Sequence, residues 1–166
     1  MLEMVIAMFI LTIGLLAVAQ AISYSLMASN RGRGVTNAKM LIVSMLEQME
    51  TLRDTGQLHF NEISNSQVSG STFKGFPNTF QPVSTVPGAD GIFGTADDLI
   101  DPATGKENTA FARPGVTRKV IITTLPDNDY LKKIEVTLRY SPNGGEMREL
   151  VCYGYLNDNE HGNYIP

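Results

Sequence analysis

Cysteine, histidine and tryptophan are scarce in this chain of 166 residues, which has one Cys, two His and no Trp. The single cysteine, Cys152, cannot form a disulfide within the chain, so a small secreted scaffold held by disulfides is excluded. Cys152 lies in a strand-like apolar run, where a free cysteine usually behaves as a small buried hydrophobe. His59 and His161 lie in polar stretches without zinc-ligand spacing. The sequence also has no phosphate-binding loop and no catalytic triad, and we expect no enzymatic activity.

Excess positive charge is also lacking, since 17 Asp and Glu residues outnumber 13 Lys and Arg residues and give a net charge of −4. Residues 1–55 carry equal numbers of acids and bases, so the whole net charge belongs to residues 56–166. A nucleic-acid-binding surface needs clustered Lys and Arg, and we therefore predict no nucleic-acid partner. The paired cations Arg118–Lys119 and Lys132–Lys133 lie in strand-like stretches, where we expect them on a solvated face.

A long apolar run opens the chain, with no charged residue between Glu3 and Arg31. A helix over residues 4–28 rises roughly 37 Å at ~1.5 Å per residue, enough to cross the hydrocarbon core of a bilayer. The run is longer than the apolar region of a signal peptide, and no basic stretch precedes it. We therefore predict a retained membrane helix over residues 1–30.

A different pattern follows in residues 31–55. Apolar residues recur there at spacings of three and four, which predicts an amphipathic helix with one buried face. They are Ala38, Leu41, Ile42, Met45, Leu46, Met49 and Leu52. Gly32 and Gly34 precede this stripe, and each costs ~1 kcal/mol relative to Ala inside a helix. We expect a bend, a melted turn or a break at these glycines, and a helix stop at residues 54–56.

The remainder, residues 56–166, is expected to form a globular β domain. Residues 57–80 are polar and irregular, with a β excursion over 71–80. Residues 82–114 contain Pro, Gly and Asp throughout, which predicts a long surface loop. A loop of this length in a small domain is usually functional or faces a partner.

Strand patterns close the chain, at residues 116–125, 130–140 and 146–156. In the middle one, Ile134, Val136, Leu138 and Tyr140 alternate with polar residues, as in a half-buried antiparallel strand. Turn-forming residues at 126–129 and 141–145 separate the three patterns. A three-stranded meander needs a cover for its apolar face, and the amphipathic helix supplies it. The predicted fold is α+β, with one long N-terminal helix whose C-terminal half packs on a small antiparallel sheet.

The first 17 residues, MLEMVIAMFILTIGLLA, resemble the N-terminus of a type IV pilin or pseudopilin. In that family the mature protein carries a glutamate at the fifth position of an apolar helix. Glu3 matches that glutamate, and its spacing to Gly14 is most similar to the minor pilins. Because the glutamate stands third here, we expect either that two residues and a leader precede this sequence or that its processing differs.

The resemblance implies a structural subunit of a helical filament made of copies of the chain, with the pilin fold. It also implies an unassembled subunit in the bacterial inner membrane, which prepilin peptidase and the pilus assembly machinery convert into an extracellular pilus. Assembly would use the side chains near the start of the helix: Glu3, Val5, Ile6, Phe9, Ile13 and Leu16. A carboxylate in a dry helix bundle needs a cation, and the resemblance implies the α-amino group of a neighbouring subunit. The alternatives are a minor pilin, a secretion-system pseudopilin, and a membrane-anchored extracytoplasmic binding module that never polymerises.

The only other stretch with the chemistry of a site is residues 87–101, called the acidic loop below. Its carboxylates lie beside glycines that permit sharp turns, at Asp90, Asp97, Asp98 and Asp101. Ca²⁺ takes 6–8 oxygen ligands, often carboxylates and loop carbonyls, so calcium is the candidate ligand. The spacing does not fit an EF-hand, and a solvated loop held by Asx-turns is the alternative. We expect Ile92 and Phe93 to anchor this loop on the domain or on a neighbouring subunit.

Overall fold

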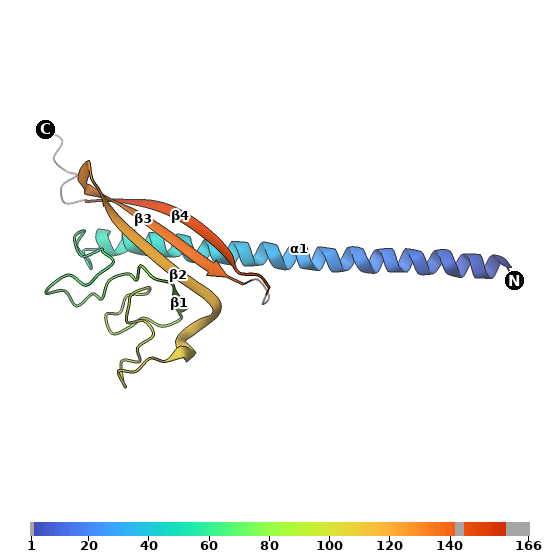
Figure 1. Cartoon of the computed structure of the whole chain (residues 1–166), viewed down its shortest axis with the longest axis horizontal. Helices are drawn as coiled ribbons and strands as arrows, with labels where there is room; N and C mark the ends of the chain where they lie inside the picture. The colour runs from blue at the N-terminus through green and yellow to red at the C-terminus, as the bar shows by residue number, and fades with distance from the viewer. Residues whose placement is uncertain (1, 142–144, 159–166) are drawn as a thin grey trace. The chain divides into compact units, whose positions relative to one another are not determined.

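The computed structural model describes residues 2–141 and 145–158. Within these residues it contains one long helix, α1 (Leu2–Asp54), and one sheet of four antiparallel strands in the order β1-β2-β3-β4 (Figure 1). The strands are β1 (Gln81–Ser84), β2 (Ala112–Leu125), β3 (Asn128–Tyr140) and β4 (Arg148–Asn157), and a short 3-10 helix, Thr109–Phe111, precedes β2. The predicted α+β fold, with one long N-terminal helix and an antiparallel sheet, is confirmed.

The chain divides into two units, Met1–Asn37 and Ala38–Pro166. In the first unit the helix is continuous through Gly32 and Gly34, so the predicted break or melted turn is wrong, whereas a bend there stays a prediction. Helix propagation gains one backbone hydrogen bond for each added residue, which outweighs the cost of two isolated glycines. The hydroxyl of Thr36 also donates to the carbonyl oxygen of Gly32, at 3.0 Å.

The second unit packs the C-terminal part of α1 along the sheet (Figure 1). The predicted stripe is confirmed, because all seven of its side chains are buried in the core or packed against it. On β3, Ile134, Val136 and Leu138 belong to the same core, as their alternation predicts. Helix and sheet approach closely at Gly154 of β4, where an added Cβ would lie 2.9 Å from Cδ2 of Leu46. A side chain at position 154 would therefore require the side chain of Leu46 to move.

The predicted helix stop is confirmed at Asp54. Gly56 adopts a φ of 69°, a left-handed conformation that glycine tolerates best. Its N–H donates to the carbonyl oxygen of Arg53 at 3.0 Å, which satisfies one of the last backbone acceptors of the helix.

The sheet contains one strand more than the predicted three-stranded meander. Residues 71–80 form no strand, so the predicted β excursion there is wrong, and β1 follows directly after them. Pro82 lies within β1, and it is tolerated because β1 is an edge strand that pairs only with β2. The predicted long loop is accordingly shorter and spans residues 85–111. The predicted turn at 126–129 is confirmed as a tight connection between β2 and β3, whereas residues 142–144 of the other turn lie outside the described residues.

The segment before β1 supplies part of the core, although its sequence pattern did not predict buried side chains. Its buried apolar side chains are Leu58, Phe60, Ile63, Phe73 and Phe76. Asn65 fastens this segment to β2 through three hydrogen bonds of 2.8 Å. Its side-chain N–H groups donate to the carbonyl oxygens of Phe76 and Val120, and its side-chain oxygen accepts from the N–H of Ile122. The irregular segment is therefore a structural layer of the domain.

Lys132 corrects the expectation that both cations of the Lys132–Lys133 pair are solvated. Its side chain is only 7% exposed. The ammonium group donates to the carbonyl oxygens of Phe60, at 2.6 Å, and Ile63, at 2.9 Å. Lys133 lies instead over the exposed ring of Tyr153, at 4.5 Å from the ring centroid. The two lysines belong to opposite faces of β3, because successive strand residues point to opposite sides.

Candidate functional site

The apolar part of α1 is exposed throughout residues 2–33. The side chains predicted for assembly, Val5, Ile6, Phe9, Ile13 and Leu16, are each at least half exposed. Residues that are apolar on every side of a helix cannot be covered by one packed layer, and they require lipid or other helices around them. By length and composition, α1 contains a segment that can cross a membrane.

Two of the polar side chains within this segment form hydrogen bonds with the helix backbone. The hydroxyl of Thr12 donates to the carbonyl oxygen of Met8 at 2.7 Å, and that of Ser23 to the carbonyl oxygen of Ala19 at 3.0 Å. Such bonds remove the need for an external partner in a dry environment. Glu3 is different, because it forms no hydrogen bond or ion pair with another described residue. It lies in the first turn, where the helix dipole favours a negative charge.

The acidic loop brings together three of its four predicted carboxylates. The hydroxyl oxygen of Thr95 lies 3.3 Å from Asp90 Oδ1, 2.8 Å from Asp97 Oδ1 and 3.0 Å from Asp98 Oδ1. Thr95, Asp97 and Asp98 are buried. One hydroxyl proton can serve only one acceptor at a time, so the carboxylates repel one another where little water screens them.

Backbone N–H groups also donate to these carboxylates. Asp90 accepts from the N–H of Ile92 at 2.9 Å, Asp97 accepts from the N–H of Asp90 at 3.2 Å, and Asp98 accepts from the N–H of Gly94. Asp101 lies outside the cluster and caps its own turn, accepting from the N–H of Ala103 at 2.9 Å. The described residues contain no group of three or more His, Cys, Asp or Glu side chains placed to hold a metal ion.

The acidic loop is attached to the domain at two points, one of which is Ile92. Ile92 packs against the core, and the backbone of Phe93 accepts from the side-chain amide of Gln48 at 3.0 Å. At Gly94, φ is 91°, and an added Cβ would lie 2.6 Å from Cε of Met45. Phe93 itself is exposed.

Arg118 corrects the expectation of a solvated cation on β2. Its guanidinium donates to the sulfur of Met45 at 3.2 Å, and burial lowers its pKa while the nearby charge of Asp98 opposes that shift. The residue shares β2 with Lys119, but its side chain points inward beneath the acidic loop. Its positive charge acts on Asp98, where it partly opposes the rise in the pKa of that carboxyl caused by burial.

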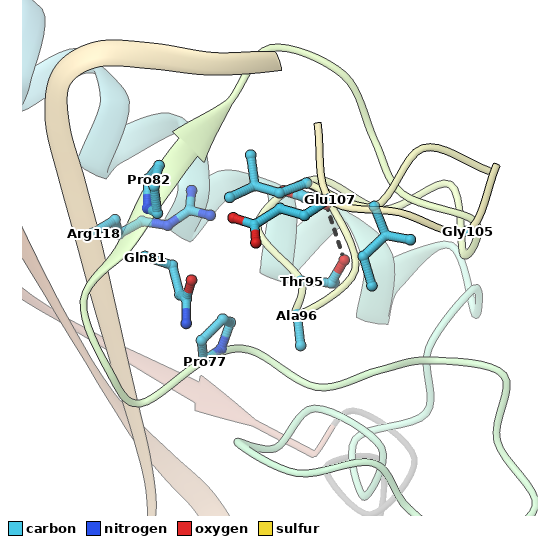
Figure 2. Close-up of a pocket in the computed structure, with 11 residues that line it drawn as sticks. Pro77, Gln81, Pro82, Thr95, Ala96, Gly105, Glu107 and Arg118 are labelled. Carbon is cyan, nitrogen blue, oxygen red and sulfur yellow. Dashed lines mark hydrogen bonds between the residues drawn. The ribbon is translucent and has the colours of Figure 1, made fainter. Parts of the chain in front are cut away.

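A pocket of ≈ 290 Å³ lies where β1, β2 and the acidic loop meet (Figure 2). Gln81, Glu107 and Arg118 present polar groups to it, between walls that include Pro77 and Pro82. No sequence signal could have grouped these residues, because they come from three separate segments. The lining carries charges of both signs, so charge alone favours neither an anion nor a cation.

Calcium binding by the acidic loop stays a prediction. Millimolar Ca²⁺ is expected to raise the unfolding temperature of the full chain in detergent, because a cation among the carboxylates offsets their repulsion. Asp97→Asn is expected to reduce this rise, whereas Asp101→Asn, outside the cluster, is expected to preserve it. An unchanged unfolding temperature in the unsubstituted chain would end the calcium hypothesis.

The same cluster predicts a pH dependence when chelator is present. Burial raises the pKa of Asp90 and of Asp98 above their ordinary values. A raised folded-state pKa contributes stability that is complete below the unfolded-state pKa and is lost as the pH rises through the folded-state value. The unfolding temperature should therefore rise as the pH is lowered from 7 towards 5. Asp98→Asn is expected to flatten this profile, and an equally steep profile in that variant would contradict the assignment.

Comparison of the chain with protein-family models, with curated proteins and with solved structures found no match.

Proposed function

We propose that this chain is a structural subunit of a type IV pilus-like filament, which assembles through the apolar part of α1. The observation that carries the proposal is a helix whose residues 2–30 have exposed, mostly apolar side chains, with Glu3 as their only charge. Length and apolarity alone would serve a membrane anchor. A carboxylate at the start of such a helix has no role in a simple anchor, where it would lie at the lipid–water interface, but it can fix the register of an assembly contact.

The energetics of assembly follow from the same segment. Each buried aliphatic side chain is worth ~1.5–3 kcal/mol relative to water. The subunit starts in lipid, however, and lipid tails are as apolar as the side chains, so most of that gain cancels. Packing and the pairing of Glu3 then decide the register between helices, and extraction from the membrane requires an assembly machine. The α+β domain would form the outer layer of the filament.

Two other assignments compete with this one, and only the second differs in what it predicts for Glu3. A minor pilin or a secretion-system pseudopilin would use the same helix and the same glutamate within a shorter or mixed assembly. A membrane-anchored binding module would leave Glu3 at the lipid–water interface without a partner subunit. The surroundings of Glu3 therefore distinguish assembly from simple anchoring.

Electron microscopy of sheared surface material, labelled with an antibody against the β domain, tests the proposal. Cells with a pilus assembly machine and this chain should release labelled filaments. A minor pilin would label sparsely, at tips or at intervals. Full-length chain that stays wholly in the membrane fraction would favour the anchored module and contradict the proposal.

A further inference from the structure

A second stripe of α1, distinct from the stripe that packs on the sheet, is exposed in the second unit. Met40 is 65% exposed, Val43 is 38% exposed, and Glu47 and Glu50 are exposed as well. Spacings of three, four and three place these side chains on one face of a helix. We call Met40, Val43, Glu47 and Glu50 the outer stripe. Neither glutamate has a hydrogen bond or ion pair from its side chain to another described residue.

The same spacing continues towards the N-terminus through Thr36 to Arg33. Positions 33, 40 and 47 are seven residues apart, as are 36, 43 and 50, which is the repeat of helices that pack in parallel along a seam. One basic residue, Arg33, lies at one end of this series, and two acidic residues, Glu47 and Glu50, lie at the other. Two copies of α1 in the same orientation therefore match their charges only when one is displaced along the other.

Arg33 also needs a counter-charge in a helix bundle. Arg31 and Arg33 are exposed, and neither has a hydrogen bond or ion pair with another described residue. The only acid among residues 2–37 is Glu3, which lies roughly 45 Å away along the helix at ~1.5 Å per residue. A guanidinium at the edge of an apolar bundle is costly unless it is paired. An acidic residue of a neighbouring copy would supply this counter-charge.

We infer that the outer stripe is a docking surface for α1 of a second copy, with Arg33 of one copy paired to Glu47 of the next. The displacement is 14 residues, or two seven-residue repeats, which corresponds to an axial shift of about 21 Å. The pair fixes the stagger between neighbouring subunits, while Met40 and Val43 provide the apolar part of the contact. This inference rests on the proposed filament function.

Charge reversal tests the pairing in cells that assemble filaments. Arg33→Glu and Glu47→Arg are each expected to lower the filament yield about tenfold or more, because each places like charges together. The two changes combined are expected to restore the yield. Asp127→Arg, an equal charge change at an exposed turn between β2 and β3, serves as the control and should assemble normally. Single variants that assemble normally, or a combined variant that stays defective, would overturn the inference.

A cross-link locates the contact directly. In a Cys152→Ala background, Arg33→Cys and Glu47→Cys introduce two thiols about 21 Å apart on one helix. A disulfide needs Cα atoms within roughly 7 Å, so a bond between these positions must join two copies. Oxidised filaments should give a ladder of oligomers on non-reducing gels, whereas each single-cysteine variant should give at most dimers. Filaments that form without a ladder would overturn this inference but not the proposed function. A full-length chain that forms no filaments would overturn both.

Discussion

Glu3→Val is expected to abolish filament formation while leaving the amount of chain in the membrane unchanged. In the membrane, the carboxylate near the helix start can remain at the interface, so its removal costs nothing. In the filament, we expect it to pair with the α-amino group of a neighbouring subunit. Removing one partner of a desolvated ion pair costs about 3–5 kcal/mol, or a factor of a hundred or more for each contact. The measurement is an immunoblot of sheared filaments against the membrane fraction.

The matched control for this prediction is Thr12→Val, a polar-to-apolar change in the same helix. The hydroxyl of Thr12 is satisfied by the carbonyl oxygen of Met8 and needs no neighbour. Its loss should therefore leave both membrane insertion and filament yield near those of the unsubstituted chain. Glu3→Gln, which keeps the shape without the charge, should fail as Glu3→Val does. A Glu3→Val chain that assembles at the normal yield would contradict the role given to this carboxylate.

Lys132→Met is expected to destabilise the β domain by about 2–5 kcal/mol. The change leaves the buried carbonyl oxygens of Phe60 and Ile63 without their donor, and each buried unsatisfied group costs about 1–3 kcal/mol. The contact between the ammonium group and the ring of Phe60, at 4.4 Å from the ring centroid, is lost as well. Thermal unfolding of the full chain in detergent, followed by circular dichroism, should show a fall of roughly 10 °C or more.

Lys133→Met is the control, because it makes the same chemical change one residue later on the opposite face of β3. Lys133 contacts an exposed ring of Tyr153, and such an interaction is worth only about 0.5–1 kcal/mol. The two variants therefore differ in the burial of the lysine and in the partners that its ammonium group loses. Equal unfolding temperatures for the two variants would show that Lys132 does not hold the segment of Phe60 and Ile63 against the sheet.

Regular periodicity made much of this fold predictable from the sequence. The stripe from Ala38 to Leu52 and the alternation around Ile134 each identify a buried face without knowledge of its partner. Lys132 lies two residues before Ile134 on β3, so the alternation of the strand places both side chains on the inner face. The expectation of a solvated lysine was wrong because it rested on residue type alone. Burial of Lys132 depends on two loop carbonyls that no periodicity reveals.

Irregular segments could not be predicted in the same way. Phe60, Phe73 and Phe76 are buried by a segment without helical or strand spacing, whose path is fixed by contacts such as those of Asn65 with β2. Edge strand β1 was missed because Pro82 argues against a strand unless its position in the sheet is known.

The acidic loop was recognised from the sequence, but its geometry was not. Composition identified the carboxylates, whereas the convergence of Asp90, Asp97 and Asp98 on Thr95 depends on the path of the loop. That path includes left-handed turns at Gly91 and Gly94, with φ values of 73° and 91°. Asp101 lies beyond these turns, where it accepts from the N–H of Ala103 instead of approaching Thr95.

A cryo-EM reconstruction of filaments assembled from this chain tests the central claim most directly. We predict a core of parallel α1 helices in which residues 2–30 of adjacent copies contact one another, with Glu3 buried beside the N-terminus of a neighbour and the β domains outside. A filament whose core excludes residues 2–30, or one in which Glu3 faces solvent, would contradict the account.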